Sequence, residues 1–228
     1  MFKRLYYILM QRMHVFANRN RPCLGKVYMF HEICDRRDTY AIAPRDFEQF
    51  LDYLINNKKV VDPDTFIEDP QPDNVLLTFD DVYASVYENA FPVLKERGVP
   101  YVIFVCGEYL DREGYLGRDM IRQMLDESRC VLGSHNMRHV LSRFEDPERI
   151  LADMKGSKQL LEEAFGRKCV DFAFPYGSMY ACSQRNIADA GSVYERVYMT
   201  YPLSYDPDCR DGLPRINMNS DTFAKEMR

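Results

Sequence analysis

Short apolar segments alternate with helical patterns along the whole chain, and this alternation constrains the fold more than any other feature. Strands are predicted at 26–30, 74–79, 101–106, 130–134, 169–174, 197–200 and 215–218. Helices are predicted at 44–57, 82–97, 116–127, 147–165 and 180–190, and a loop rich in Pro and Asp at 63–73. A βα series of this kind, without repeats or linkers, predicts a mostly parallel sheet, either open or closed as a barrel.

Polar side chains with catalytic or ligating chemistry follow several of these predicted strands. They are His31, the pair Asp80 and Asp81, His135, and the turn Pro175-Tyr176-Gly177. In an α/β barrel the carboxyl ends of the strands meet on one face, so residues placed there would form one site. This placement favours the closed barrel.

The pair of carboxylates and two histidines suggest a metal site. Adjacent carboxylates at the end of an apolar strand repel each other unless a cation lies beside them. His135 and His139 are four residues apart and can close on one ion. Two imidazoles and one carboxylate leave positions open on the metal, as in catalytic sites, and the second carboxylate can then serve as a base. Mixed N and O ligands lead us to expect Zn²⁺, with Co²⁺ or Ni²⁺ as substitutes.

Three segments resemble the motifs of a known family. The sequences TFDD at 78–81, SHNMRH at 134–139 and FAFPYG at 172–177 resemble the first three motifs of the polysaccharide deacetylases, the NodB-homology group of carbohydrate esterase family 4. The resemblance extends over residues 26–219. It implies one domain with a distorted (β/α)7-8 TIM-like barrel and metal-dependent removal of N- or O-acetyl groups.

The resemblance also implies a role for each matching residue. Asp80 matches the catalytic base, and Asp81, His135 and His139 match the metal ligands. Tyr176 matches the residue whose backbone N–H holds the oxyanion, although Pro-Tyr-Gly taken alone is equally typical of a plain turn.

Several positions depart from the family pattern. Asn136 stands where Ser or Thr is usual, and Ala173 stands where many members have an Arg that orients the base. The chain has no Trp and no His after His139, so the family's fourth motif and its late acid His are missing. The sequence MFHEI at 29–33 resembles a permuted subgroup that includes poly-N-acetylglucosamine deacetylases, and His31 matches its general acid. Sugar contacts are then expected from tyrosines, with Tyr83, Tyr176 and Tyr180 as candidates.

We therefore predict a metal-dependent hydrolase that removes acetyl groups, N-acetyl above all, from an amino-sugar polysaccharide, oligosaccharide or glycan precursor. Two alternatives stay open. One is a weakly active or inactive relative that only binds carbohydrate, because Ala173 removes the orienting Arg. The other is a non-haem Fe(II) enzyme, which also uses two His and one carboxylate but usually with a close H-x-D/E pair.

Charge and cysteine content exclude other classes. The 30 Lys and Arg against 35 Asp and Glu give a net charge of −5, which argues against nucleic acid as a partner. The 7 Cys show no C-x-x-C pair, so they are expected to be reduced and mostly buried. The sequence predicts no oligomeric state.

Residues 1–22 form a separate basic segment before the predicted domain at 23–228. The segment has five Lys or Arg and no acid, and apolar residues recur in it at helical spacing: Phe2, Leu5, Leu9, Met13 and Phe16. Two interpretations follow, a helix packed on its own domain and an amphipathic membrane anchor. Without a signal-peptide core or cleavage site, the protein is expected in the cytoplasm, with peripheral contact to the inner membrane face as the second interpretation.

Overall fold

A parallel sheet, nearly closed into a barrel, forms the centre of this single-domain protein. The computed structural model describes residues 2–36, 38–207 and 212–227. The main strands are β1 (Lys26–Phe30), β5 (Asn74–Asp80), β6 (Tyr101–Val105), β7 (Cys130–Ser134), β8 (Asp171–Ala173), β9 (Arg196–Met199), β10 (Leu213–Pro214) and β11 (Ile216–Asn217). Their order is β10-β9-β8-β7-β6-β5-β1-β11, and every neighbouring pair is parallel. This confirms the predicted barrel.

The last segment of the sheet closes the barrel. β10 pairs with β9, where Leu213 lies opposite Tyr198, and β11 pairs with β1, where Ile216 lies opposite Tyr28. Only Arg215 separates β10 from β11 along the chain. Residues 213–217 therefore join the two edges of the sheet, and Arg215 is fully buried at the joint.

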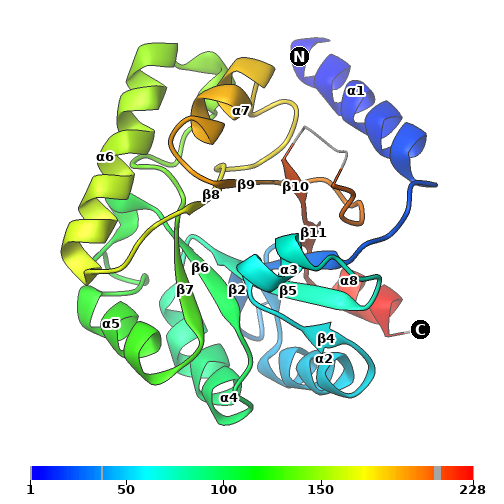
Figure 1. The fold of residues 1–228 in the computed structure, drawn as a ribbon, viewed down its shortest axis with the longest axis vertical. Helices are drawn as coiled ribbons and strands as arrows, with labels where there is room; N and C mark the ends of the chain where they lie inside the picture. Colours follow the sequence, from blue (N-terminus) through cyan, green and yellow to red (C-terminus); the bar gives the residue numbers. More distant parts are fainter. Residues whose placement is uncertain (1, 37, 208–211, 228) are drawn as a thin grey trace.

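Smaller strands and the helices surround this barrel (Figure 1). β4 (Lys59–Val60) pairs with β5, while β2 (Glu32–Ile33) and β3 (Ala41–Ile42) pair with each other. The helices are α1 (Phe2–Asn18), α2 (Pro44–Asn57), α3 (Pro63–Glu68), α4 (Phe91–Glu96), α5 (Arg118–Glu127), α6 (Pro147–Phe165), α7 (Gln184–Gly191) and α8 (Ser220–Glu226). A π-helical turn, η1 (Val86–Ala90), precedes α4, and 3-10 turns lie at Gly107–Tyr109 and Ser142–Phe144.

One predicted helix start is wrong, and two helices lie where the sequence predicts none. The helix predicted from residue 82 starts two residues later, at Ala84, because Asp81 and Val82 adopt left-handed φ angles of 60° and 51°. The loop predicted at 63–73 contains α3, whose first turn is capped by the Asp62 side chain accepting the Thr65 N–H. Helix α8 was not predicted either, and Asn219 caps it in the same way.

Alternation along the strands separates two apolar layers. In β6, Tyr101, Ile103 and Val105 pack in the larger cluster, whereas Val102 and Phe104 belong to a second cluster together with Ala173 and Tyr198. Successive side chains of a strand point to opposite faces. The same alternation in β5 places Val75, Leu77 and Phe79 in the larger cluster, so Thr78 and Asp80 point to the opposite face, inside the barrel.

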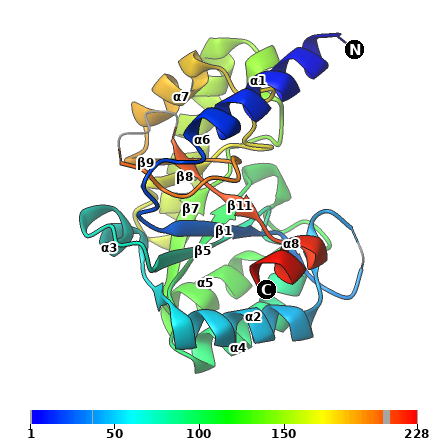
Figure 2. The same ribbon diagram turned by 90° about the vertical axis from the view of Figure 1, so that its right-hand side faces the viewer.

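Helix α1 lies at one end of the molecule, at the opposite end from α2 (Figures 1 and 2). It contacts the domain through its polar side, where Gln11 donates a hydrogen bond to the Thr200 carbonyl at 3.2 Å and accepts one from the Met179 N–H at 3.1 Å. Its apolar residues face outward. Exposed fractions are 65% for Leu5, 56% for Leu9, 58% for Met13 and 64% for Phe16. No helix among the described residues is long and apolar enough to cross a membrane.

Candidate metal and catalytic site

The residues predicted to form one site do line one cavity. The cavity has a volume of about 320 Å³ and contains all six predicted site residues: His31, Asp80, Asp81, His135, His139 and Tyr176. His31 directly follows β1, Asp80 ends β5 and His135 directly follows β7. The barrel therefore gathers residues that lie far apart in the sequence, because the carboxyl ends of its parallel strands meet on one face.

Asp81, His135 and His139 are arranged as metal ligands. The Asp81 Oδ1 atom lies 3.5 Å from His135 Nε2 and 3.3 Å from His139 Nε2. Ligands held at zinc distances around a tetrahedral ion are about 3.3 Å apart, so these separations suit one ion. Asp81 Oδ1 is buried and has no hydrogen-bond partner in the described part of the chain, which a cation would supply. The three residues thus fit a divalent metal ion.

A hydrogen bond outside this set orients one of the ligands. His135 Nδ1 lies 2.8 Å from the Ala173 carbonyl oxygen, so Nδ1 carries the proton and Nε2 presents its lone pair to Asp81. Burial lowers the pKa of His135 to about 3 and also lowers that of His139, which keeps both imidazoles neutral. Neutral imidazole is the form that binds a metal.

The charge of Arg215 compensates the Asp81 carboxylate only in part. Burial, followed by the charge of Asp80, raises the pKa of Asp81 to about 7. A divalent cation between the three side chains would stabilise the ionised carboxylate and reverse that shift. Electrostatics and geometry therefore favour the same occupant.

Asp80 has its own counter-charge in Arg215. The guanidinium donates to both carboxylate oxygens, with Nη1–Oδ1 at 2.6 Å and Nη2–Oδ2 at 2.7 Å. Nη1 also donates to Thr78 Oγ1 at 3.2 Å. Burial is the largest single influence and by itself would raise the pKa of Asp80. The charge and hydrogen bonds of Arg215, together with the histidines His135 and His31, outweigh burial and hold that pKa below its usual value. Asp80 is therefore an ionised, fixed carboxylate, as a base requires.

Arg215 is a candidate functional residue that the sequence motifs do not indicate. The motif position that would carry an orienting Arg holds Ala173, and Arg215 supplies the guanidinium from the barrel joint instead. Its ring neighbours are Phe104 and Tyr198, at 5.2 and 5.9 Å from the guanidinium carbon. A signal was present, because a single Arg within the apolar segment 213–218 must find a partner if it is buried.

A sharp turn separates the two carboxylates. Asp81 and Val82 both have left-handed backbones, and the Val82 N–H donates to the Asp80 carbonyl at 2.6 Å. A β-branched residue such as Val82 rarely adopts such angles. Each non-glycine residue held in this conformation costs on the order of 1–3 kcal/mol of folding free energy. The turn directs Asp80 to Arg215 and Asp81 to the histidines, so neighbouring residues can have different tasks.

The turn at Tyr176 forms another part of the cavity wall. Tyr176 has a left-handed φ of 62°, and its amide N–H makes no hydrogen bond within the described ranges. Gly177 follows with φ 49°, and the Thr200 N–H donates to its carbonyl at 2.7 Å. A Cβ on Gly177 would lie 2.8 Å from Thr200 N, so glycine is required for this close approach. The turn leaves the Tyr176 N–H available to a ligand.

His31 lies in the same cavity with one free ring nitrogen. It is 8% exposed, packs against Tyr40 at 4.9 Å between ring centres, and has no partner for Nδ1 among the described residues. Burial lowers its pKa to about 4, so the imidazole is neutral in the free protein.

Of the three tyrosines predicted to contact sugar, two line the cavity and one does not. Tyr83 and Tyr176 line the cavity, as expected for sugar contacts. Tyr180 does not line it and packs instead against Tyr7 and Phe144. Asn136 adopts a left-handed φ of 69°, which Asn tolerates well, and its Nδ2 donates to the Arg138 carbonyl at 3.3 Å.

Together these features define a class of protein: a parallel β/α barrel with an Asp-His-His ligand set beside an Arg-paired carboxylate at its strand ends. Comparison with known families agrees, and the chain belongs to the polysaccharide deacetylase family, whose model matches residues 68–194.

Two bacterial proteins are similar to this chain over about two thirds of its length. YxkH of Bacillus subtilis (strain 168) is 25% identical over 164 residues, which cover 69% of this chain and 58% of YxkH. A poly-beta-1,6-N-acetyl-D-glucosamine N-deacetylase of Staphylococcus aureus (strain MRSA252) is 27% identical over 165 residues, 66% of this chain and 56% of that protein. The matches thus span somewhat more than half of these relatives.

Solved structures show the same fold over nearly the whole chain. IcaB from Ammonifex degensii superposes with a TM-score of 0.78 at 26% identity, covering 90% of this chain and 96% of IcaB. BC0361, a polysaccharide deacetylase from Bacillus cereus, superposes with a TM-score of 0.76 at 21% identity, covering 90% of this chain and 69% of BC0361. At this identity the likeness shows a shared fold.

Proposed function

We propose that this protein is a metal-dependent deacetylase that removes N-acetyl groups from an amino-sugar glycan. Membership of the polysaccharide deacetylase family supports the reaction, and the name of the Staphylococcus aureus relative supports an N-acetylglucosamine polymer as substrate class. One structural observation carries the proposal. An ionised carboxylate, Asp80, lies fixed by Arg215 beside the ligand set of Asp81, His135 and His139.

The site residues have complementary tasks in amide hydrolysis. When bound to Asp81, His135 and His139, a divalent cation supplies Lewis acidity toward the acetyl oxygen and the attacking water. Asp80 accepts a proton from that water as the new C–O bond forms. The Tyr176 N–H donates a hydrogen bond to the oxyanion that develops.

His31 completes the reaction at the leaving group. As the C–N bond breaks, the leaving nitrogen needs a proton, and His31 is the one cavity-lining histidine among the described residues that is not in the ligand set. The free protein holds His31 neutral. We infer that it takes up a proton from solvent as the tetrahedral intermediate forms, because the negative charge of the oxyanion favours imidazolium. Acetate and a free amine are the products.

The identity of the metal is proposed from the ligand types, and the cellular location is predicted from the sequence. We propose Zn²⁺ because imidazole and carboxylate ligands in a set of three suit it, with Co²⁺ or Ni²⁺ as alternatives. The cytoplasmic location stays a prediction, which fractionation of cells would test.

Acetate release from N-acetylated β-1,6-linked glucosamine oligomers tests the proposal. Zinc-loaded protein should release acetate, and Asp80→Asn should abolish release because the base is lost. Asp119→Asn is a matched control, since Asp119 is 98% exposed on α5 and should leave release unchanged. Zinc-loaded protein that binds these oligomers and releases no acetate would instead support a carbohydrate-binding role. Oxygen-dependent turnover with iron would support the Fe(II) alternative.

A further inference from the structure

Helix α1 is an amphipathic helix docked by its polar side. The half-buried residues Tyr7, Gln11, His14 and Asn18 recur at spacings of four, three and four, which is one side of a helix. Tyr7 lies under the Arg143 guanidinium at 4.2 Å from its ring centre, and His14 lies 5.3 Å from the Tyr201 ring. These contacts fix which side of the helix faces outward.

The outward side is apolar, and no other element of the described part of the chain covers it. Leu5, Leu9, Met13 and Phe16 recur on it, and each is more than half exposed. A helix that only packs on its own domain turns this side inward, because burying each such residue contributes about 1.5–3 kcal/mol. A contiguous exposed apolar surface marks an interaction site.

Arginines border this apolar side. Arg4, Arg12 and Arg19 are exposed and form no ion pair within the described ranges. A groove of about 390 Å³ runs between α1 and Pro202, with Arg12 and Arg19 at its sides and Val15 and Phe16 among its apolar walls. Such a groove offers two guanidinium groups to an anionic headgroup directly beside a surface for acyl chains.

We propose that the outward side of α1 binds the surface of an anionic phospholipid bilayer. The helix would lie in the interface, with Leu5, Leu9, Met13 and Phe16 toward the acyl chains and the arginines at the headgroups. A second copy of this chain fits less well, because residues 1–31 contain no acid and pairing two such helices would bring the same positive charges together.

The polar contacts of α1 connect this surface to the cavity wall. Gln11 bonds to Thr200, which lines the cavity, and to Met179, three residues after Tyr176. A bilayer on the outward side of α1 is therefore separated from that part of the cavity wall by little more than the helix itself. This inference on lipid binding does not depend on the proposed deacetylase activity.

Vesicle flotation with the full chain tests the proposal. Vesicles of phosphatidylcholine alone are compared with vesicles of phosphatidylcholine and phosphatidylglycerol in equal parts. Partition should be at least about tenfold greater on the anionic vesicles and should fall with added salt. Leu9→Gln with Phe16→Gln should lower partition about 100-fold, since each large apolar side chain contributes about tenfold. Arg12→Gln with Arg19→Gln should lower it on anionic vesicles only.

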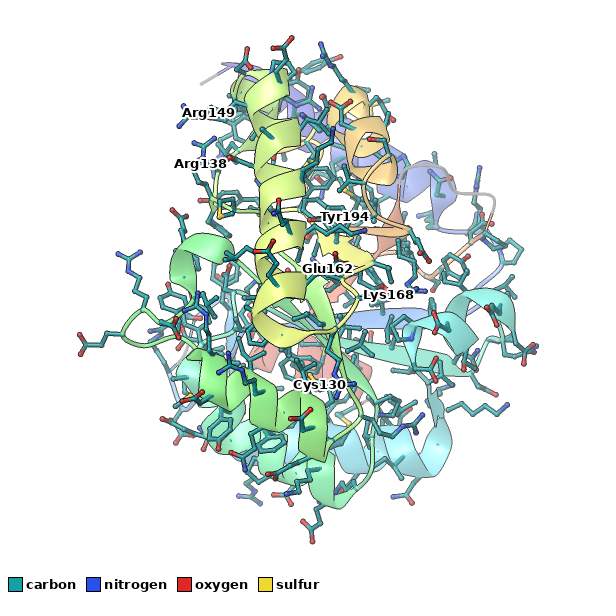
Figure 3. The ribbon with its side chains drawn as sticks, turned by 60° about the vertical axis from the view of Figure 1, so that its left-hand side comes forward. Cys130, Arg138, Arg149, Glu162, Lys168 and Tyr194 are labelled. Atoms are coloured by element: carbon teal, nitrogen blue, oxygen red, sulfur yellow. The ribbon has the colours of Figure 1, made fainter. Side chains whose placement is uncertain are left out.

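Matched controls lie on other parts of the domain. Ile55→Gln removes a side chain that is 42% exposed on α2, at the far end of the molecule, and should leave partition unchanged. Arg149→Gln with Lys168→Gln removes two charges near opposite ends of α6 (Figure 3) and should also have no effect. Circular dichroism confirms that each variant is folded.

Two results would overturn the proposal. One is flotation of Leu9→Gln with Phe16→Gln at the level of the parent protein, and the other is equal partition of the parent protein on both kinds of vesicle. Analytical ultracentrifugation identifies the alternative occupant. A dimer that dissociates on the Leu9 and Phe16 substitutions would assign this surface to a second copy of the chain.

Discussion

Arg215 is expected to control the base through a single buried ion pair. The substitution Arg215→Met keeps most of the side-chain volume and removes the charge, so the buried Asp80 carboxylate loses its counter-ion. Breaking a buried pair in this way costs about 3–5 kcal/mol. For a chain of 228 residues such a loss lowers the midpoint of thermal unfolding by about 6–10 °C.

The catalytic effect should be larger than the loss of stability explains. Without Arg215, burial raises the pKa of Asp80, the carboxyl takes up a proton and its orientation is no longer fixed. We expect kcat for acetate release to fall by at least about 100-fold, measured well below the unfolding temperature. Stopped-time acetate assays and calorimetry on the same preparations separate the two effects.

A second buried ion pair provides the control. Arg196 donates to both carboxylate oxygens of Asp171, with Nε–Oδ1 at 2.6 Å and Nη2–Oδ2 at 2.8 Å. These residues begin β9 and β8, at the opposite end of the barrel from the cavity. Arg196→Met should therefore destabilise the protein without changing kcat of the folded fraction. Equal kcat in Arg215→Met and Arg196→Met would refute the role given to Arg215.

Two further predictions concern the metal and α8. Zinc at about 100 times its dissociation constant should stabilise the protein by about 2.7 kcal/mol, raising its unfolding temperature by about 5 °C in calorimetry. Asp81→Asn should lose that rise, whereas Asp119→Asn should keep it. Glu226 is partly buried, which raises its pKa, but hydrogen bonds from Lys26 and Tyr28 outweigh burial and lower it. Its stabilisation is therefore present above pH ~4.3 and lost as pH falls through the lowered pKa. In urea unfolding, Glu226→Gln should cost about 1.5–3 kcal/mol at pH 7, and the difference should vanish in strong acid; a constant difference would contradict this.

The gathering of the site could be predicted from the sequence because it follows from topology. His31, Asp80 and His135 each come at the end of an apolar strand, and a parallel barrel brings all such ends to one face. No knowledge of side-chain packing is needed for that step. Asp81 follows Asp80 directly and His139 lies four residues after His135, so both are also predicted to lie close enough to share an ion.

Arg215 and the orientation of α1 could not be predicted because both depend on tertiary contacts. Arg215 lies 135 residues from Asp80 along the chain, and nothing local indicates which carboxylate it meets. Helical spacing shows that α1 has an apolar side, but not which side contacts the domain. Single polar contacts of Gln11 and Tyr7 determine which side packs on the domain, and such contacts produce no periodic pattern in the sequence.

The barrel joint at 213–217 makes the proposed activity depend on the segment of the sheet that is synthesised last. A nascent chain that ends before Arg215 can already contain Asp80 and all three proposed metal ligands, yet Asp80 then lacks the counter-charge of Arg215. Fraying of the same short segment in the mature protein would open the sheet and unpair Asp80 in one event. Heat inactivation should then precede global unfolding, and amide exchange should be faster in β10 and β11 than in β5 and β6.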